Sequence, residues 1–298
     1  MSTAHHSPTT TDPIVRPAWL SQETWPFTIR THDTGLGRIA YTDEGAGPIL
    51  VLVHSGTWSV LWRDLAASLH KDFRVITFDP PATGLSDTGD GAGLGQTADA
   101  LDSLVRSLEL TDIVIVAHDL GGPASLQAVS HWPERVRGYV AVNCFGWRPS
   151  GPVFRAMLWV MGSGFMRESD AWTGWLPAAT STRFGAGSHW SRTDRHAFRR
   201  GMDRRGRRSF HRNMRSALRH DYTAVDRGRI ALVAKPILTV FGQRNDPLRF
   251  QPRWREAGRM VEQVMVPRGY HFPMCDDPQL VARILIDWHQ RNVGARAS

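Results

Sequence analysis

The feature that most constrains the fold is a series of short, continuous apolar runs that alternate with helical patterns. The apolar runs are 49–53, 75–78, 113–116, 139–142, 237–240 and 264–266. The helical patterns lie at 61–70, 97–108, 123–131, 254–260 and 279–290. A strand that is buried on both faces has this continuous apolar character, and such strands are typical of parallel sheets. The alternation therefore predicts a doubly wound, mostly parallel α/β sheet, preceded by two short strands within residues 25–41.

The alternation stops between about Arg148 and Arg229, where the chain contains four tryptophans, several glycines and no run typical of a buried strand. This pattern favours a mostly helical insertion. An insertion at the carboxyl end of a strand lies over the crevice where open α/β sheets bind ligands. We therefore expect a helical cap at 148–228, a core made of 25–147 and 229–298, and a flexible N-terminal tail at 1–24.

Cysteine content and hydropathy indicate the class of protein. The two cysteines, Cys144 and Cys275, provide neither a disulfide framework nor a metal-ligand cluster, and we expect free thiols. The first twelve residues are polar and lack the apolar run of a secretory signal, and no stretch approaches the length that spans a bilayer. These observations predict a cytoplasmic protein without a metal and without a membrane partner.

The basic charge is concentrated in one part of the chain. The formal net charge is +8, and because Lys71 and Lys235 are the only lysines, 34 of the 36 basic residues are arginine. Residues 183–219 contain twelve arginines against Asp194 and Asp203. A basic surface attracts phosphate, but a solvated helical face has the same composition. We expect no nucleic-acid partner; the alternative is an arginine-rich binding protein on a non-catalytic scaffold.

Residues Ala117–Gly121, which read Ala-His-Asp-Leu-Gly, directly follow the apolar run at 113–116. Two small residues that flank a central nucleophile at this spacing are typical of a sharp strand-to-helix turn, in which the central residue is usually serine. Here the central residue is Asp119. A carboxylate is a poor nucleophile for acyl transfer, but it displaces a leaving group from a saturated carbon. The residue type therefore favours carbon–halogen or epoxide opening over ordinary ester cleavage.

Three more motifs follow apolar runs. They are His54–Trp58 after the first run, Phe241–Asp246 after the run at 237–240, and Gly269–Phe272 after the run at 264–266. Taken singly, Asp119 and Asp246 are also favoured helix caps, and His271 is also compatible with a core position. Together the motifs place a nucleophile, an acid and a histidine at three strand ends in the order Asp119, Asp246, His271. This joint occurrence favours the catalytic interpretation.

With residues 79–87 and Pro133–Val136, these motifs resemble the haloalkane dehalogenase branch of the α/β-hydrolase superfamily, from roughly Thr28 to Val293. The resemblance implies an α/β-hydrolase fold with an inserted helical cap. It also implies Asp119 as the nucleophile, His271 as the base and Asp246 as its partner. The covalent ester would be hydrolysed by water, with the oxyanion held by backbone N–H groups of the nucleophile turn and of the first loop. The predicted oxyanion residues are Leu120, Ser55 and Gly56, and no cofactor is needed.

The groups that would assist the leaving group depart from the family pattern. Dehalogenases of this family have a tryptophan directly after the nucleophile, where this chain has Leu120, and the loop that begins at His54 is one residue shorter. The candidate donors are His54, Trp58, Trp147 and Trp159, while Tyr222 is the single cap tyrosine that suits an epoxide hydrolase.

We therefore predict a haloalkane dehalogenase-like hydrolase of a small hydrophobic molecule. The alternatives are an epoxide hydrolase and an atypical ester or biosynthetic hydrolase. The leaving group, the mobility of the cap and the choice between monomer and homodimer stay open.

Overall fold

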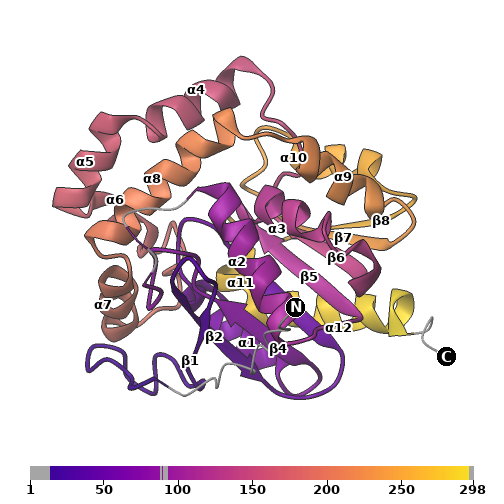
Figure 1. Cartoon of the computed structure of the whole chain (residues 1–298), viewed down its shortest axis with the longest axis horizontal. Helices are drawn as coiled ribbons and strands as arrows, with labels where there is room; N and C mark the ends of the chain where they lie inside the picture. Colours follow the sequence, from indigo (N-terminus) through magenta and orange to yellow (C-terminus); the bar gives the residue numbers. More distant parts are fainter. Residues whose placement is uncertain (1–13, 88, 90–92, 295–298) are drawn as a thin grey trace, which may run out of the picture.

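The computed structural model describes residues 14–87, 89 and 93–294, and within them the strands form one eight-stranded sheet (Figure 1). The strands are β1 (Arg30–Asp33), β2 (Arg38–Glu44), β3 (Ile49–Val53), β4 (Arg74–Phe78), β5 (Ile113–His118), β6 (Val136–Val142), β7 (Pro236–Gly242) and β8 (Met260–Val266). Their order is β1-β2-β4-β3-β5-β6-β7-β8. The first two strands pair antiparallel, and the strands from β3 to β8 run parallel. The predicted mostly parallel α/β sheet is confirmed.

Helices cover both faces of the sheet. The core helices are α1 (Arg63–Leu69), α2 (Leu94–Ser107), α3 (Gly121–Val129), α10 (Phe250–Arg253), α11 (Pro273–Asp276) and α12 (Pro278–Asn292), with 3₁₀ turns at Ser59–Trp62, Pro133–Arg135 and Trp254–Ala257. Helix α1 packs on α12, while α2 packs on α3. The central strands are buried between these layers, which explains their continuous apolar runs.

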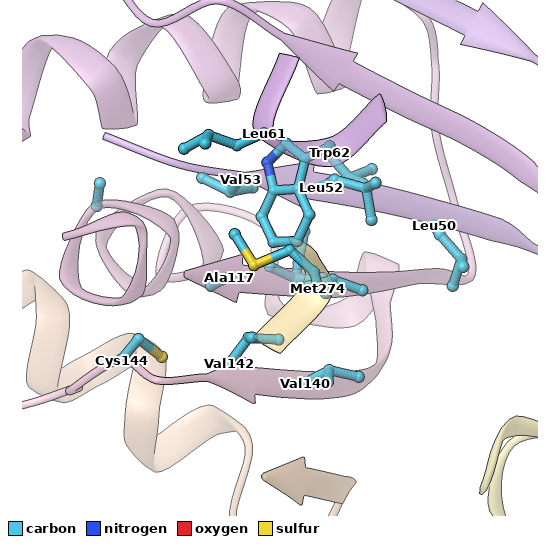
Figure 2. Packing of buried hydrophobic residues seen from close by; sticks show 14 of the residues in the cluster. Leu50, Leu52, Val53, Leu61, Trp62, Ala117, Val140, Val142, Cys144 and Met274 are labelled. Carbon is cyan, nitrogen blue, oxygen red and sulfur yellow. The ribbon is translucent and has the colours of Figure 1, made fainter. Parts of the chain in front are cut away.

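The core on one side of the central strands brings together side chains from distant parts of the sequence. In Figure 2, Leu52 and Val53 of β3 lie near Trp62, and Met274 lies close to the same ring. These residues are almost completely excluded from solvent. Cys144 and Cys275 are also buried and form no disulfide, as predicted.

The carboxyl ends of the central strands lie at one edge of the sheet. The register pairs Val53 with Ala117 and His118 with Val142. It also pairs Gly242 with Val266, so β7 and β8 end together. Because parallel strands that end in register project their following loops from the same edge, side chains from several loops meet there.

The insertion between β6 and β7 forms helices beyond this edge. They are α4 (Pro152–Met161), α5 (Gly164–Thr173), α6 (Trp175–Thr180), α7 (Arg192–Gly201) and α8 (Arg204–Arg219), followed by α9 (Thr223–Ala231). Helices α4 and α5 lie outermost, on α8 (Figure 1). Helix α9 instead packs on α3, because Gly228 has no side chain and lies directly against the backbone of Leu126. The expected cap boundary at 228 therefore falls inside a helix that belongs to the core layer.

The segment 14–24 packs on the body of the molecule, so the expectation of a flexible tail through residue 24 is wrong for these residues. Leu20 and Thr24 are buried, and the Arg16 guanidinium donates to the carbonyl groups of Trp25 and Phe27. Residues 1–13 of the expected tail lie outside the described residues. Across the described part of the chain, no helix has both the length and the apolar character needed to cross a bilayer.

Candidate active site

The turn after β5 projects Asp119 above the sheet edge. Its φ angle of 50° lies in the left-handed region, which is unfavourable for a residue with a side chain. The small residues after it allow the turn to pack closely: a side chain at Gly121 would meet the backbone oxygen of Val53 at 2.5 Å, and one at Gly122 would overlap the carbonyl of Phe145. The Ala117–Gly121 motif therefore has a steric cause.

His271, in the loop after β8, faces Asp119, with 3.9 Å between its Nε2 atom and Oδ2 of the Asp119 carboxylate. Its backbone carbonyl accepts hydrogen bonds from Nε2 of His118 at 2.7 Å and from Nδ2 of Asn143 at 2.9 Å. Asn143 follows β6, and its Oδ1 accepts from the N–H of Gly242 at 3.0 Å. The position of His271 is thus fixed by residues at the ends of β5, β6 and β7.

The structure does not pair Asp246 with His271. Both Asp246 carboxylate oxygens accept backbone N–H groups, from Phe250 at 2.6 Å and from Gln251 at 3.0 Å. This is the helix-cap alternative for Asp246. The side chain that meets His271 Nδ1 is Asn245, whose Nδ2 lies 3.1 Å away.

Burial controls the charges around Asp119. Desolvation raises the pKa of Asp119, while the charge of His271 and the backbone N–H of Leu120 act against this rise. The Leu120 N–H is thus directed at the Asp119 carboxylate, as an oxyanion donor must be. Burial also lowers the pKa of His54 to about 3 and that of His118 well below its ordinary value. At neutral pH these two imidazoles are uncharged.

The other two predicted oxyanion residues are held by the cap. The hydroxyl of Ser55 donates to Oδ1 of Asn213 in α8 at 2.8 Å. Gly56 has a φ angle of 90°, and a side chain there would meet Phe210 of α8 at 3.2 Å. Neither residue lines the cavity above Asp119. Their packing against α8 fixes the loop that begins at His54.

A cavity of about 230 Å³ lies between the sheet edge and the cap, with Asp119 and His271 in its wall. The other lining residues are His54, Thr57, Met157, Leu176, Pro177, Thr180, Phe198, Met202, Phe210, Met214 and Phe272. Most of these side chains are apolar, as is usual for a site that binds a hydrophobic molecule. A larger cavity, of about 530 Å³, lies at the amino ends of β3, β6 and β7, away from Asp119.

Of the predicted leaving-group candidates, only His54 lines the cavity. The Trp58 Nε1–H donates to the carbonyl of Phe198 at 3.2 Å. Trp147 is packed against Trp254 and lies under the guanidinium of Arg253. Both indoles therefore have structural partners away from Asp119.

The two candidates in the insertion also lie elsewhere. Trp159 is on the outside of α4 with 58% of its surface exposed. The Tyr222 hydroxyl donates to the carbonyl of Ala217 at 3.0 Å, and burial raises its pKa well above the ordinary value. The polar side chain that lies beside His54 is Thr57, with 3.0 Å between its Oγ1 and His54 Nδ1.

Asn143 and Asn245 were not among the residues that we predicted for the site. A usable signal was present for Asn143, because it directly follows the apolar run of β6 in the way that Asp119 follows β5. Asn245 is a neighbour of the predicted acid, and the sequence alone does not show which of the two side chains faces His271.

Comparisons with known proteins show the family to which the chain belongs. Residues 50–284 match the model described as "Alpha/beta hydrolase family". Haloalkane dehalogenase 2 of Mycobacterium tuberculosis is 29% identical over 280 residues, which cover 88% of this chain and 95% of that protein.

Solved structures share the fold. A haloalkane dehalogenase from Bradyrhizobium elkani superposes with a TM-score of 0.76 at 20% identity, covering 91% of this chain and 99% of that one. The epoxide hydrolase CorEH gives a TM-score of 0.73 at 18% identity, and the superposition covers 89% of this chain and 99% of that one. The chain belongs to the alpha/beta hydrolase family, and within that family it resembles the haloalkane dehalogenases.

Proposed function

We propose that this enzyme hydrolyses the carbon–halogen bond of a small hydrophobic molecule, with Asp119 as the nucleophile and without a cofactor. The observation that carries the proposal is the position of the Asp119 carboxylate, in the wall of a largely apolar cavity of about 230 Å³ and 3.9 Å from Nε2 of His271. The overall similarity to haloalkane dehalogenase 2 supports the same reaction class.

The reaction has two steps. An Asp119 carboxylate oxygen attacks the carbon that carries the halogen, a carbon–oxygen bond forms, and the halide leaves with the bonding electrons. A water molecule then transfers a proton to His271 and attacks the carbonyl carbon of the Asp119 ester. Collapse of this intermediate releases the alcohol and restores the carboxylate, and the proton on His271 passes to solvent. The N–H of Leu120 stabilises the oxyanion.

Stabilisation of the departing halide is assigned to the pair of His54 and Thr57, two polar side chains that line the cavity. Because the 3.0 Å hydrogen bond between them uses one of their two protons, the pair has one remaining donor for the halide. A neutral imidazole always has one N–H group to donate, and the depressed pKa of His54 keeps the ring neutral at neutral pH. Epoxide opening lacks comparable support, because the hydroxyl of Tyr222 is bound to a backbone carbonyl outside the cavity.

The proposal predicts a trapped covalent intermediate. The substitution His271→Phe removes the base, so the ester on Asp119 should form but not be hydrolysed. After incubation with 1-bromobutane, intact-protein mass spectrometry should detect a butyl adduct, and peptide mapping should place it on Asp119. With 1,2-epoxybutane, a hydroxybutyl adduct would instead identify an epoxide hydrolase.

The matched control is His271→Phe combined with Asp119→Asn, which has the same cavity without the nucleophilic carboxylate. It should gain no adduct. Asp119→Asn alone should be inactive yet folded, because burial already disfavours the charged form of this side chain. An adduct that survives in the double variant contradicts the nucleophile assignment. Absence of any adduct from both reagents contradicts both reaction classes.

A further inference from the structure

The outer surface of α4 and α5 exposes several large apolar side chains to solvent. They are Val153, Met157, Trp159, Val160, Phe165 and Trp172, with exposed fractions between 43% and 80%. We call this set the cap face. Scattered single apolar residues are normal on a protein surface, but six large exposed apolar side chains on two consecutive helices mark an interaction site.

The packing of the two helices explains why most of these side chains point outward. Helices α4 and α5 both rest on α8, so their opposite sides form the rim of the molecule (Figure 1). Of the ten residues of α4, only Phe154 and Leu158 are buried. Phe165 and Trp172 are seven residues apart, two turns of α5, and therefore lie on one side of that helix.

The cap also contains the positive charge of the molecule. Residues 148–228 include sixteen arginines and six carboxylates, whereas the whole chain has a formal net charge of +8. The carboxylates of α5 are already paired: Glu168 binds Arg208 at 2.8 Å, and Asp170 is buried against His211. No described acidic side chain of α4 or α5 is therefore left to offset the cationic surroundings.

Cationic and aromatic side chains are combined on the cap face itself. The guanidinium of Arg204 lies 4.0 Å from the ring centroid of Trp172. Arg155 is exposed on α4, between the apolar positions. Helices that lie in the headgroup region of anionic membranes present this combination, with tryptophan, phenylalanine and aliphatic residues beside arginine.

We propose that the cap face docks on the surface of an anionic lipid bilayer. A second copy of the chain is a poorer partner, because two caps of high positive charge repel each other. A nucleic acid would neutralise the arginines but would leave the exposed apolar side chains in water. A bilayer offers acidic headgroups to the arginines and apolar chains to the aromatic residues.

Docking of this kind brings the active-site cavity to the membrane. Met157 belongs both to the cap face and to the lining of the cavity that contains Asp119. A hydrophobic molecule dissolved in the bilayer would therefore be close to the cavity. The proposal departs from the expectation of no membrane partner, which considered only segments long enough to span a bilayer. It goes beyond the proposed reaction and does not depend on it.

The test is flotation of the full chain with lipid vesicles. The protein should float with phosphatidylcholine vesicles that contain phosphatidylglycerol and stay at the bottom with pure phosphatidylcholine. Added salt should weaken the binding, because it screens the arginines from the headgroups. The double variant Trp159→Ser/Phe165→Ser should reduce the partition coefficient at least about tenfold.

Two control variants match these changes elsewhere on the surface. Leu36→Ser removes an apolar side chain that is 73% exposed on the turn between β1 and β2, and it should bind like the unaltered protein. Charge reversal on the cap side, in Arg155→Glu/Arg204→Glu, should abolish flotation. Charge reversal away from the cap, in the control Arg283→Glu on α12, should cause only a small loss of vesicle binding. Circular dichroism and thermal unfolding confirm that each variant is folded.

Three results would overturn the proposal. The first is no flotation with anionic vesicles. The second is equal loss in Leu36→Ser and in the cap-face variant. The third is a different occupant of the surface. A dimer in sedimentation velocity that Trp159→Ser/Phe165→Ser dissociates would assign the surface to a second copy. A duplex DNA complex that this variant retains while vesicles do not bind would assign it to nucleic acid.

Discussion

In the proposed mechanism, the side chain that faces Nδ1 of His271 affects how readily this ring takes a proton from water. In serine hydrolase triads a buried carboxylate holds this position and stabilises the imidazolium. Here the position belongs to Asn245, whose carboxamide has no charge. The amide oxygen and nitrogen exchange places when the group turns over, and the oxygen is the group that accepts from a protonated Nδ1.

Asn245→Asp should strengthen the base. A carboxylate 3.1 Å from Nδ1 stabilises the imidazolium, so we expect the acidic limb of the activity profile, where protonated His271 is inactive, to move to higher pH. At alkaline pH, kcat should increase by roughly tenfold or more, because the step that protonates His271 becomes more favourable. The measurement is kcat/KM and kcat against pH.

The matched control is Asp246→Ala. It removes the acceptor of the Phe250 and Gln251 N–H groups and should lower the free energy of unfolding by about 1 kcal/mol without moving the pH profile. If Asp246→Ala moves the profile while Asn245→Asp does not, then Asp246 is the partner of His271 after all.

This pair of residues also shows what the sequence could predict about the site. The order of the motifs predicted that Asp119 and His271 lie together, and the structure places their side chains 3.9 Å apart. Which of Asn245 and Asp246 faces the ring depends on the path of one loop. Asp246 is drawn away because its carboxylate caps the backbone of α10, an interaction that competes with pairing to His271.

At the scale of elements, the close packing of α9 on α3 depends on Gly228. A methyl group at this position would overlap the backbone carbonyl of Leu126. Gly228→Ala should therefore lower the free energy of unfolding by about 1–3 kcal/mol, through displacement of α9. Urea denaturation measures the change.

The control for Gly228→Ala is Gly95→Ala in α2, where nothing lies within 4 Å of the added carbon. This variant should be more stable by up to about 1 kcal/mol, because alanine favours a helix more than glycine does. Equal effects of the two substitutions would contradict the role of the close contact.

The strands were predictable because burial on both faces leaves a continuous apolar pattern in each of them. The end of the cap was not predictable, because α9 is held in the core layer by its packing on α3, where Gly228 meets Leu126, a residue distant in sequence. The exposure of Trp159 and the burial of Tyr222 are likewise set by neighbouring helices rather than by the residues themselves.

At the scale of the whole molecule, two buried neutral histidines make the fold sensitive to acid. In the unfolded chain an imidazole takes up a proton below about pH 6.5. Folded His54 does so only near its pKa of about 3, and the pKa of His118 is also well below the ordinary value. Between about pH 6.5 and the lowered pKa of each folded histidine, the unfolded state binds more protons than the folded state. The stability of the fold therefore decreases as the pH falls through this interval.

Each of these imidazoles should lower the free energy of unfolding by roughly 1.4 kcal/mol for each pH unit by which the pH falls within that interval. Buried carboxylates such as Asp79 and Asp119, whose pKa values are raised by burial, oppose the loss in the most acidic part of the range. Urea titrations from pH 8 to pH 4 on the unaltered chain and on His54→Gln provide the measurement. In the variant, the free energy of unfolding should change less steeply with pH, by the equivalent of about one proton. An unchanged slope would contradict a neutral, buried His54.

The residues that hold the reacting groups and those that enclose the substrate come from different layers. Asp119, Asn143 and His271 stand on the ends of sheet strands, whereas Phe198 and Met214 in the cavity wall belong to the cap. Most of the cap side chains that enclose the substrate can therefore change without displacing the groups at the strand ends. Phe210 of α8 is the exception, because it lines the cavity and also packs on Gly56 in the loop that begins at His54.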